Sequence, residues 1–329
     1  MLLRFAVYLA WTAGLALFAC LIVYQGLGDI MTVLASAGWG LAIVTGFHLA
    51  PLVVDALGWR ELLTASQRRS ITQLAWIRWI GESANSLLPV AQVGGELLRV
   101  RLLNRAGVSG AMAGASVIVD ITAGMLTLIV FALMGIILLL AEGGATEAVA
   151  ELTIGIMIFS ALGLISLLAQ RAGIFLAVAR LVERTAKGRE WRVLTGGAAA
   201  LDQTVIRLYR RRCAVFITCG WRLLGWLLGA GEVWLALYFL GHPVGLREAL
   251  ILESLTQALR SAAFAIPGAL GVQETSFIVL GGMLGVGADT ALALSLMKRV
   301  RELVLGVPGL VAWQITEGRH AWRQQMSES

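Results

Sequence analysis

Long apolar runs recur along most of this 329-residue chain. A helix needs about 20 residues to cross the hydrocarbon core of a bilayer, and within lipid every backbone N–H and C=O must be paired inside the protein. The runs lie at about 5–24, 40–57, 109–141, 152–169, 213–240, 275–296 and 302–316. The sequence therefore predicts an all-α polytopic membrane protein, with room for roughly eight spans and no separate soluble catalytic domain.

The composition excludes an ordinary soluble domain, because 58% of the residues are hydrophobic and only 14% are charged, against about 25% charged in soluble proteins. The net charge of +6 does not indicate nucleic-acid binding, since the basic residues gather between the apolar runs. Cys20, Cys213 and Cys219 show no metal-ligand spacing and predict no disulfide framework. We expect no metal and no cofactor.

The placement of Lys and Arg predicts how the chain is oriented. Residues 171–212 contain ten Lys or Arg and three acids, so this basic loop is expected in the cytoplasm, with an interfacial helix on the inner leaflet. It separates a first membrane half, 1–170, from a second, 213–329. We expect a multi-pass protein of the bacterial inner membrane.

Two further segments, 77–103 and 248–274, are apolar but interrupted by proline, glycine and charge. The flanking charges place both ends of the first segment on the cytoplasmic side and both ends of the second on the external side. Each segment is therefore predicted to be re-entrant. Broken helices at corresponding positions of two inverted halves point to a transporter's binding site, so we expect two inverted, pseudo-symmetric halves.

The two segments share a pattern, because a glutamate follows a proline by seven positions in each: Pro89 and Glu96, then Pro267 and Glu274. Proline ends the preceding helix, and the next helix begins with unpaired N–H groups and a partial positive charge. Such a helix start suits a phosphate or a carboxylate. The pattern favours a binding site for an anionic group at the breaks.

Polar residues at helical spacing accompany both breaks. A charged side chain inside a membrane span costs free energy unless it faces a cavity or a partner, so these residues are expected to line a pathway. The candidate substrate-binding residues are Glu82, Asn85, Pro89, Gly94, Gly95, Glu96 and Arg99 in the first segment and Glu253, Gln257, Arg260, Pro267, Gly268, Gly271 and Glu274 in the second. The alternative is that they pair with one another, as Glu96 with Arg99 or Glu253 with Arg260.

Other ionisable residues fall inside or beside apolar runs. Structural pairing is the favoured interpretation for Asp55, Asp120, Arg222 and Glu232, with Arg222 as a candidate partner of Glu232 and proton relay as the alternative. His48 is interpreted as a packing residue. The basic residues at 298–301, which lie between two apolar runs, are predicted to form a cytoplasmic connection.

The stretch from Asn85 to Arg99, with Leu88-Pro89 and Gly94-Gly95-Glu96-x-x-Arg99, and the later Ile266-Pro267-Gly268-x-x-Gly271-x-x-Glu274, resemble the paired motifs of the lysylphosphatidylglycerol-synthase transmembrane-region, or flippase-like, family. The similarity extends to its hopanoid-biosynthesis-associated branch. The resemblance implies two pseudo-symmetric halves with re-entrant helices and movement of a lipid between leaflets. The aminoacyl-transferase domain of the full-length synthases is not expected in this chain.

The first hypothesis is therefore a lipid flippase whose substrate is a membrane lipid, anionic or a biosynthetic intermediate. Arg99 and Arg260 would attract the headgroup, while Glu96 and Glu274 would gate or couple protons. A lipid-modifying membrane enzyme is disfavoured, because the three histidines show no catalytic spacing. A third hypothesis is a non-transporting partner that docks lipid-biosynthetic enzymes through the basic loop. Assembly into a homo-oligomer is a further possibility.

Overall fold

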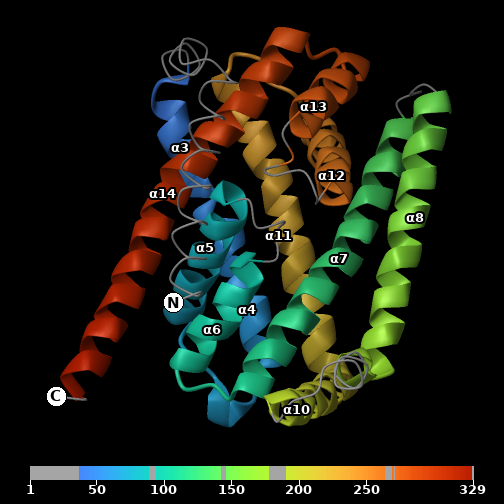
Figure 1. Cartoon of the computed structure of the whole chain (residues 1–329). Coiled ribbons are helices and arrows are strands. Elements are labelled where there is room, and N and C mark those ends of the chain that lie inside the picture. Colours follow the sequence, from blue (N-terminus) through green and yellow to red (C-terminus); the bar gives the residue numbers. More distant parts are fainter. Residues whose placement is uncertain are drawn as a thin grey trace.

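The computed structural model describes residues 37–88, 94–141, 146–177, 190–263, 269 and 271–327. Throughout these residues the regular structure is helical, so the all-α prediction is confirmed. The predicted run at 5–24 lies outside the described part of the chain. Figure 1 shows the helices arranged as one elongated bundle, with α11 running through its middle.

The helices are α3 (Trp39–Phe47), α4 (Leu49–Leu62), α5 (Ile71–Leu87), α6 (Gly94–Arg105), α7 (Gly110–Ala141), α8 (Thr146–Arg171), α10 (Glu190–Arg210), α11 (Arg212–Phe239), α12 (Leu246–Ala262), α13 (Val272–Met283) and α14 (Ala288–Ser327). A short 3-10 turn spans Ala65–Gln67. Three stretches are long and apolar enough to cross a membrane: Trp39–Leu62, Gly110–Ala141 and Arg212–Phe239. The chain is thus a membrane-embedded helical protein.

A helical hairpin occupies the first segment that was predicted to be broken, and a second hairpin begins in the other, although its second helix, α13, lies mostly in the apolar run predicted at 275–296. The first pairs α5 with α6 and the second pairs α12 with α13. In each hairpin the first helix has 17 residues and the second has 12, which is fewer than the roughly 20 residues that a span needs. Figure 1 shows the first hairpin in the half of the bundle that contains α10 and the second at the opposite end. The inverted-repeat relationship itself stays a prediction.

Glycine lets the first hairpin close tightly. The backbone of Gly95 lies so near that of Gly81 that a Cβ atom at Gly95 would overlap the Gly81 carbonyl oxygen. In the second hairpin, Gly271 precedes α13 with a φ of 78°, a left-handed conformation that glycine adopts without a steric penalty. Both glycines are therefore needed for backbone geometry, which is a simpler role than ligand contact.

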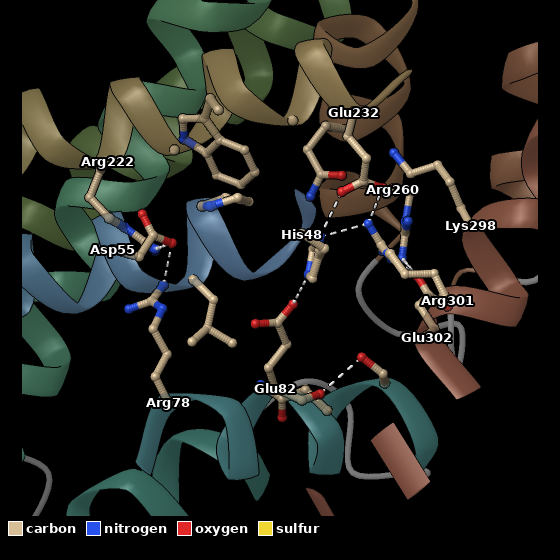
Figure 2. Close-up of a pocket in the computed structure, with 18 of the residues that line it drawn as sticks. His48, Asp55, Arg78, Glu82, Arg222, Glu232, Arg260, Lys298, Arg301 and Glu302 are labelled. Carbon is tan, nitrogen blue, oxygen red and sulfur yellow. Dashed lines mark hydrogen bonds and ion pairs between the residues drawn. The ribbon is translucent and has the colours of Figure 1, made fainter. Parts of the chain in front are cut away.

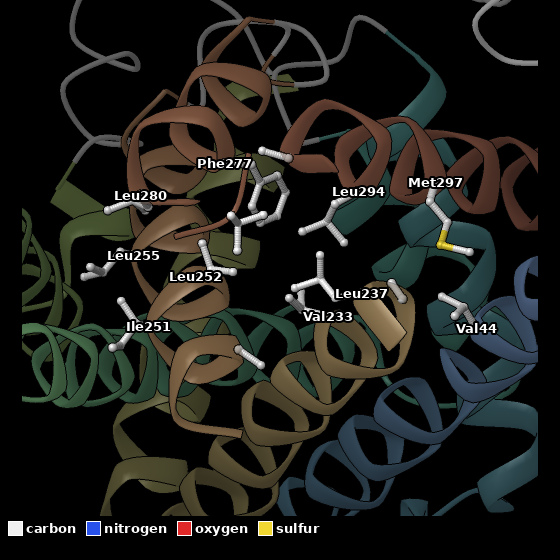
Figure 3. Packing of buried hydrophobic residues seen from close by; sticks show 14 of the residues in the cluster. Val44, Val233, Leu237, Ile251, Leu252, Leu255, Phe277, Leu280, Leu294 and Met297 are labelled. Atoms are coloured by element: carbon white, nitrogen blue, oxygen red, sulfur yellow. The ribbon is translucent and has the colours of Figure 1, made fainter. Parts of the chain in front are cut away.

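Two apolar clusters support the hairpins. The larger cluster joins Val233 and Leu237 of α11 to Leu252 of α12, Phe277 of α13 and Leu294 of α14 (Figure 3). The second cluster surrounds Trp59 and holds α5, α6, α7 and α10 together. The predicted amphipathic helix of the basic loop is present as α10, which buries Val205 and Leu208 in this second cluster and lies across one end of the bundle (Figure 1).

The C-terminal region differs from the prediction of two runs joined by a basic loop. Helix α13 ends at Met283, and α14 continues unbroken for 40 residues from Ala288. Lys298 and Arg301 therefore lie inside a helix and are buried. The basic residues thus do not connect two separate runs, because their cations are paired with carboxylates of neighbouring helices; their placement on the cytoplasmic side stays a prediction.

Candidate functional site

A cavity of about 310 Å³ lies among both helices of the first hairpin, α12 of the second hairpin, and α4, α11 and α14. Both predicted polar stripes reach it. Its ionisable lining consists of six acids, Asp55, Glu82, Glu96, Glu232, Glu253 and Glu302, and of six cations, Arg78, Arg99, Arg222, Arg260, Lys298 and Arg301, together with His48. Figure 2 shows these charged side chains converging from separate helices. The cavity is thus highly charged but nearly balanced.

The first group of contacts is the Asp120 cluster, defined as Asp55, Arg78, Glu96, Arg99, Asp120 and Arg222. Asp120 of α7 is fully buried and accepts hydrogen bonds from Arg78 at 3.0 Å and Arg99 at 2.6 Å. Asp55 of α4 accepts from Arg78 at 2.7 Å and Arg222 at 2.5 Å, as Figure 2 shows. These ion pairs connect the first hairpin to α4, α7 and α11.

Arg99 has a third partner and an aromatic neighbour. Its Nη1 donates to Glu96 Oε2 at 2.6 Å, and its guanidinium carbon lies 4.3 Å from the ring centroid of Trp59. Charge pairing and a cation–π contact therefore hold this arginine in place, at only 3% exposure. A ligand that used Arg99 would have to compete with Asp120 and Glu96.

The second group is the His48 cluster, defined as His48, Glu82, Glu232 and Arg301. His48 lies where α3 meets α4. Its Nε2 is 3.0 Å from Glu82 Oε1, and its Nδ1 is 2.7 Å from Glu232 Oε2 and 2.8 Å from Arg301 Nη1. Arg301 also donates to Glu232. In Figure 2 the imidazole lies between the two carboxylates.

The third group is the Glu274 cluster, defined as Arg260, Gln273, Glu274, Ser295, Arg299 and Glu302. Arg260 donates to Gln273 and, at 3.0 Å, to Glu302. Arg299 donates to Glu274 at 3.2 Å and to Glu302 at 3.2 Å. A separate buried pair joins Lys298 to Glu253 at 2.5 Å. Helix α14 therefore supplies a charged partner to both helices of the second hairpin.

A predicted residue caps the second helix of each hairpin. The Gly95 N–H, in the first turn of α6, donates to Asn85 Oδ1 at 2.8 Å, and the Gly271 N–H, immediately before α13, donates to Glu274 Oε2 at 2.8 Å. Side-chain oxygens satisfy N–H groups in this way at many helix starts. At these two amides an anionic ligand would have to displace a side chain of the protein.

The structure brings together most of the predicted site residues. The predicted residues that line the cavity are Glu82, Asn85, Glu96, Arg99, Glu253, Gln257 and Arg260. Glu274 adjoins it through the contact of Arg299 with Glu302, while Gly94, Gly95 and Gly271 belong to the hairpin backbones. Pro89, Pro267 and Gly268 lie outside the described residues.

The predicted ion pairs had mixed outcomes. Glu96 does pair with Arg99. Glu253 binds Lys298 instead of Arg260, and Arg222 binds Asp55 instead of Glu232. The interpretation of His48 as a packing residue was wrong, because it hydrogen-bonds two carboxylates.

The residues that sequence reasoning left out of the site are mainly Arg78 and the charged residues of α14, Lys298, Arg301 and Glu302. Their signal was present in the sequence: ionisable side chains between apolar stretches are functional candidates by default. The positive-inside count assigned the basic group to a loop, since that count does not consider pairing with distant acids.

A family model described as the lysylphosphatidylglycerol synthase TM region matches residues 11–309. No curated protein and no solved structure matches the chain.

Proposed function

Since this chain belongs to the lysylphosphatidylglycerol synthase transmembrane-region family, we propose that it is a lipid flippase, which moves a membrane lipid between leaflets by accepting its headgroup in the charged cavity. The observation that carries the proposal is the meeting of both hairpins at one cavity, with six acids and six cations in its wall. We further propose that it moves the lipid without chemically altering it.

The cost of the charges argues for a function. A charged residue at the centre of a bilayer costs about 2.5–3.5 kcal/mol or more unless it is paired or hydrated. A purely structural bundle would be as stable, or more stable, with apolar residues at such positions. Retaining so many paired charges around a cavity is therefore expected of a polar passage, which lowers the cost of desolvating a headgroup.

The size of the cavity indicates which part of a lipid it would hold. Ligand pockets of about 300–1,000 Å³ accommodate compact small molecules, so a cavity of about 310 Å³ suits a headgroup. We propose that the acyl chains remain in the surrounding hydrocarbon while the headgroup passes through. Apolar surface is plentiful on the outside of the bundle, for example at Ile137 and Phe216.

Arg260 and Glu274 are the residues with the clearest proposed roles. Arg260 lines the cavity and has 18% of its side chain exposed, so it can exchange Glu302 for an anionic group. Glu274 holds both the start of α13 and Arg299, so its contacts would couple hairpin position to the state of the cavity. Arg99 and Glu96 are the corresponding pair on the first hairpin.

The test is lipid exchange in liposomes containing the purified protein. Fluorescent phosphatidylglycerol and phosphatidylcholine report anionic and zwitterionic cargo, and an impermeant reductant bleaches the outer leaflet. Arg260→Gln and Glu274→Gln are compared with Arg247→Gln and Asp289→Asn, which remove the same charges at exposed positions of α12 and α14. Equal reconstitution and equal helical circular dichroism are required of all variants.

We expect exchange above that of empty liposomes, reduced about tenfold or more by each cavity variant, because a lost charge-assisted hydrogen bond is worth roughly 1.5–3 kcal/mol. The exposed variants should match the wild type. Exchange that is unaffected by the cavity variants would refute this pathway. No exchange of either lipid would favour the non-transporting partner of a lipid-biosynthetic complex.

A further inference from the structure

We propose that His48 is a proton-binding site that controls which headgroups the cavity accepts, with the protonated form admitting an anionic headgroup. This inference rests on the proposed flippase function for its consequence, but the proton site itself can be tested without transport. Histidine is the side chain whose unperturbed charge changes between about pH 5 and 8. His48 lines the cavity and touches charged side chains of three other helices.

The two ring nitrogens have different surroundings. Nε2 lies 3.0 Å from Glu82 Oε1, which can only accept a hydrogen bond when ionised. Nδ1 lies 2.7 Å from an acceptor, Glu232 Oε2, and also 2.8 Å from a donor, Arg301 Nη1. Nδ1 is therefore the nitrogen that can be either a donor or an acceptor at its present position.

This geometry defines two hydrogen-bonding states. The imidazolium has two N–H donors, so it donates to Glu82 and Glu232 together and joins α5 to α11. The neutral ring has one N–H, which goes to Glu82, while its bare Nδ1 accepts from Arg301. Loss of the proton thus removes the His48–Glu232 bond and leaves α11 held at this point by Arg301 alone.

The protonation state of His48 decides the net charge of the ionisable groups around the cavity. Three arginines face three carboxylates in the Asp120 cluster, two arginines face two carboxylates in the Glu274 cluster, and Lys298 faces Glu253. The His48 cluster has two glutamates and one arginine. Among these groups, protonated His48 completes a neutral set, and neutral His48 leaves one excess negative charge.

Of the helices in the described part of the chain, α5, α7, α11 and α14 pack against α3 and α4. Glu82 faces His48 from α5, Glu232 from α11 and Arg301 from α14. Farther along α14, Lys298 and Glu302 are engaged by Glu253 and Arg260. The acids of α4 and α7, Asp55 and Asp120, are held by the arginines of the Asp120 cluster.

The consequence is linkage between the proton and the headgroup. An excess negative charge in the wall of a cavity repels a phosphate more strongly than it would in bulk water, and the added proton removes that charge. Two ligands that each favour binding of the other are reciprocally coupled. Acidification should therefore increase the exchange of anionic lipid, and a variant that cannot take the proton should lose this pH dependence.

The first experiment measures exchange of fluorescent phosphatidylglycerol from pH 5.5 to 8.5, with the same pH on both sides of the liposome. The wild type should lose about tenfold or more of its rate across this range. His48→Gln, which is neutral at every pH, should vary by about twofold or less, while His242→Gln, at an exposed position, should follow the wild type. Matching profiles for wild type and His48→Gln would overturn the proposal.

The second experiment needs no transport and no His48 variant. The chain has three histidines, so 13C-labelled imidazole resonances can be assigned by removing His242 and His320 in turn. The remaining His48 resonance should titrate between about pH 5 and 9 and should shift in Glu232→Gln. A His48 signal that does not titrate would refute the proton site, whereas titration without any lipid exchange would refute only the flippase function.

Discussion

Lys298 Nζ lies 2.5 Å from Glu253 Oε2, and both side chains are buried. This pair joins the N-terminal third of α14 to α12, the first helix of the second hairpin. Removing one member of a buried ion pair leaves an uncompensated charge, which typically costs 3–5 kcal/mol, whereas replacing both members by neutral groups costs much less. The pair therefore allows a direct test of how the second hairpin is held.

We expect Lys298→Met to lower the free energy of unfolding by about 3–5 kcal/mol, because Glu253 would remain buried without its cation. The double variant Lys298→Met/Glu253→Gln should recover at least half of that loss. Thermal unfolding in detergent, followed by circular dichroism, measures both. If the double variant is less stable than the single variant, Glu253 has another cationic partner and our assignment of the pair is incorrect.

Among the carboxylates that contact the first hairpin, Asp120 is expected to cause the largest loss of stability when it is substituted. Asp120→Asn would leave Arg78, Arg99 and Arg222 facing one carboxylate fewer, with an expected cost of about 3–5 kcal/mol. Asp289→Asn, an exposed change on α14, should stay within about 0.5 kcal/mol. Chemical unfolding of both proteins in the same detergent compares them, and equal midpoints would contradict the central role of Asp120.

The close approach of α5 and α6 predicts opposite effects for two glycine substitutions. Gly95→Ala places a methyl group against the Gly81 carbonyl and should destabilise the protein by about 1–3 kcal/mol. Gly220→Ala introduces a methyl group into open space on α11 and should stabilise by about 0.5–1 kcal/mol. Melting temperatures measured side by side should therefore move in opposite directions. An unchanged melting temperature for Gly95→Ala would indicate that the backbones of α5 and α6 lie farther apart than the structure places them.

Helix α10 is attached to α8 through one polar contact that can be removed cleanly. Tyr209 Oη lies 2.6 Å from Gln170 Oε1. Tyr209→Phe should cost about 1 kcal/mol, the usual net value of a hydrogen bond, and should increase protease cleavage near α10. Tyr238→Phe, at an exposed position of α11, is the matched control. Equal cleavage of both variants would show that the Tyr209 hydrogen bond does not help to hold α10.

The sequence predicted those elements that are determined by neighbouring residues in the chain. The long run at 109–141 became α7, and the run at 213–240 became α11, because apolar length alone dictates a helix in lipid. The interruption at 77–103 became a helical hairpin, and the one at 248–274 became the first helix and the turn of another, whose second helix extends into the run predicted at 275–296. The polar stripe on each first helix reached the cavity, since residues three and four positions apart share a face.

Partners across the bundle could not be predicted, because pairing depends on how distant helices pack. Arg222 and Glu232 lie on one helix but not within one turn of each other, and each binds a residue far away in the chain. His48 showed no sign of its two glutamates, which lie 34 and 184 positions away. The basic group at 298–301 looked like a loop anchor because its acidic partners came from other helices.

Helix α14 carries Lys298, Arg301 and Glu302 within little more than one turn, and these residues contact α12, α11 and the α3–α4 junction. Successive residues of an α-helix are rotated by about 100°, so a small rotation of α14 about its long axis would move all three side chains at once. We therefore expect a rotation of α14 to break its contacts with this cavity wall together. Opening of the cavity on this side should then be a single cooperative step.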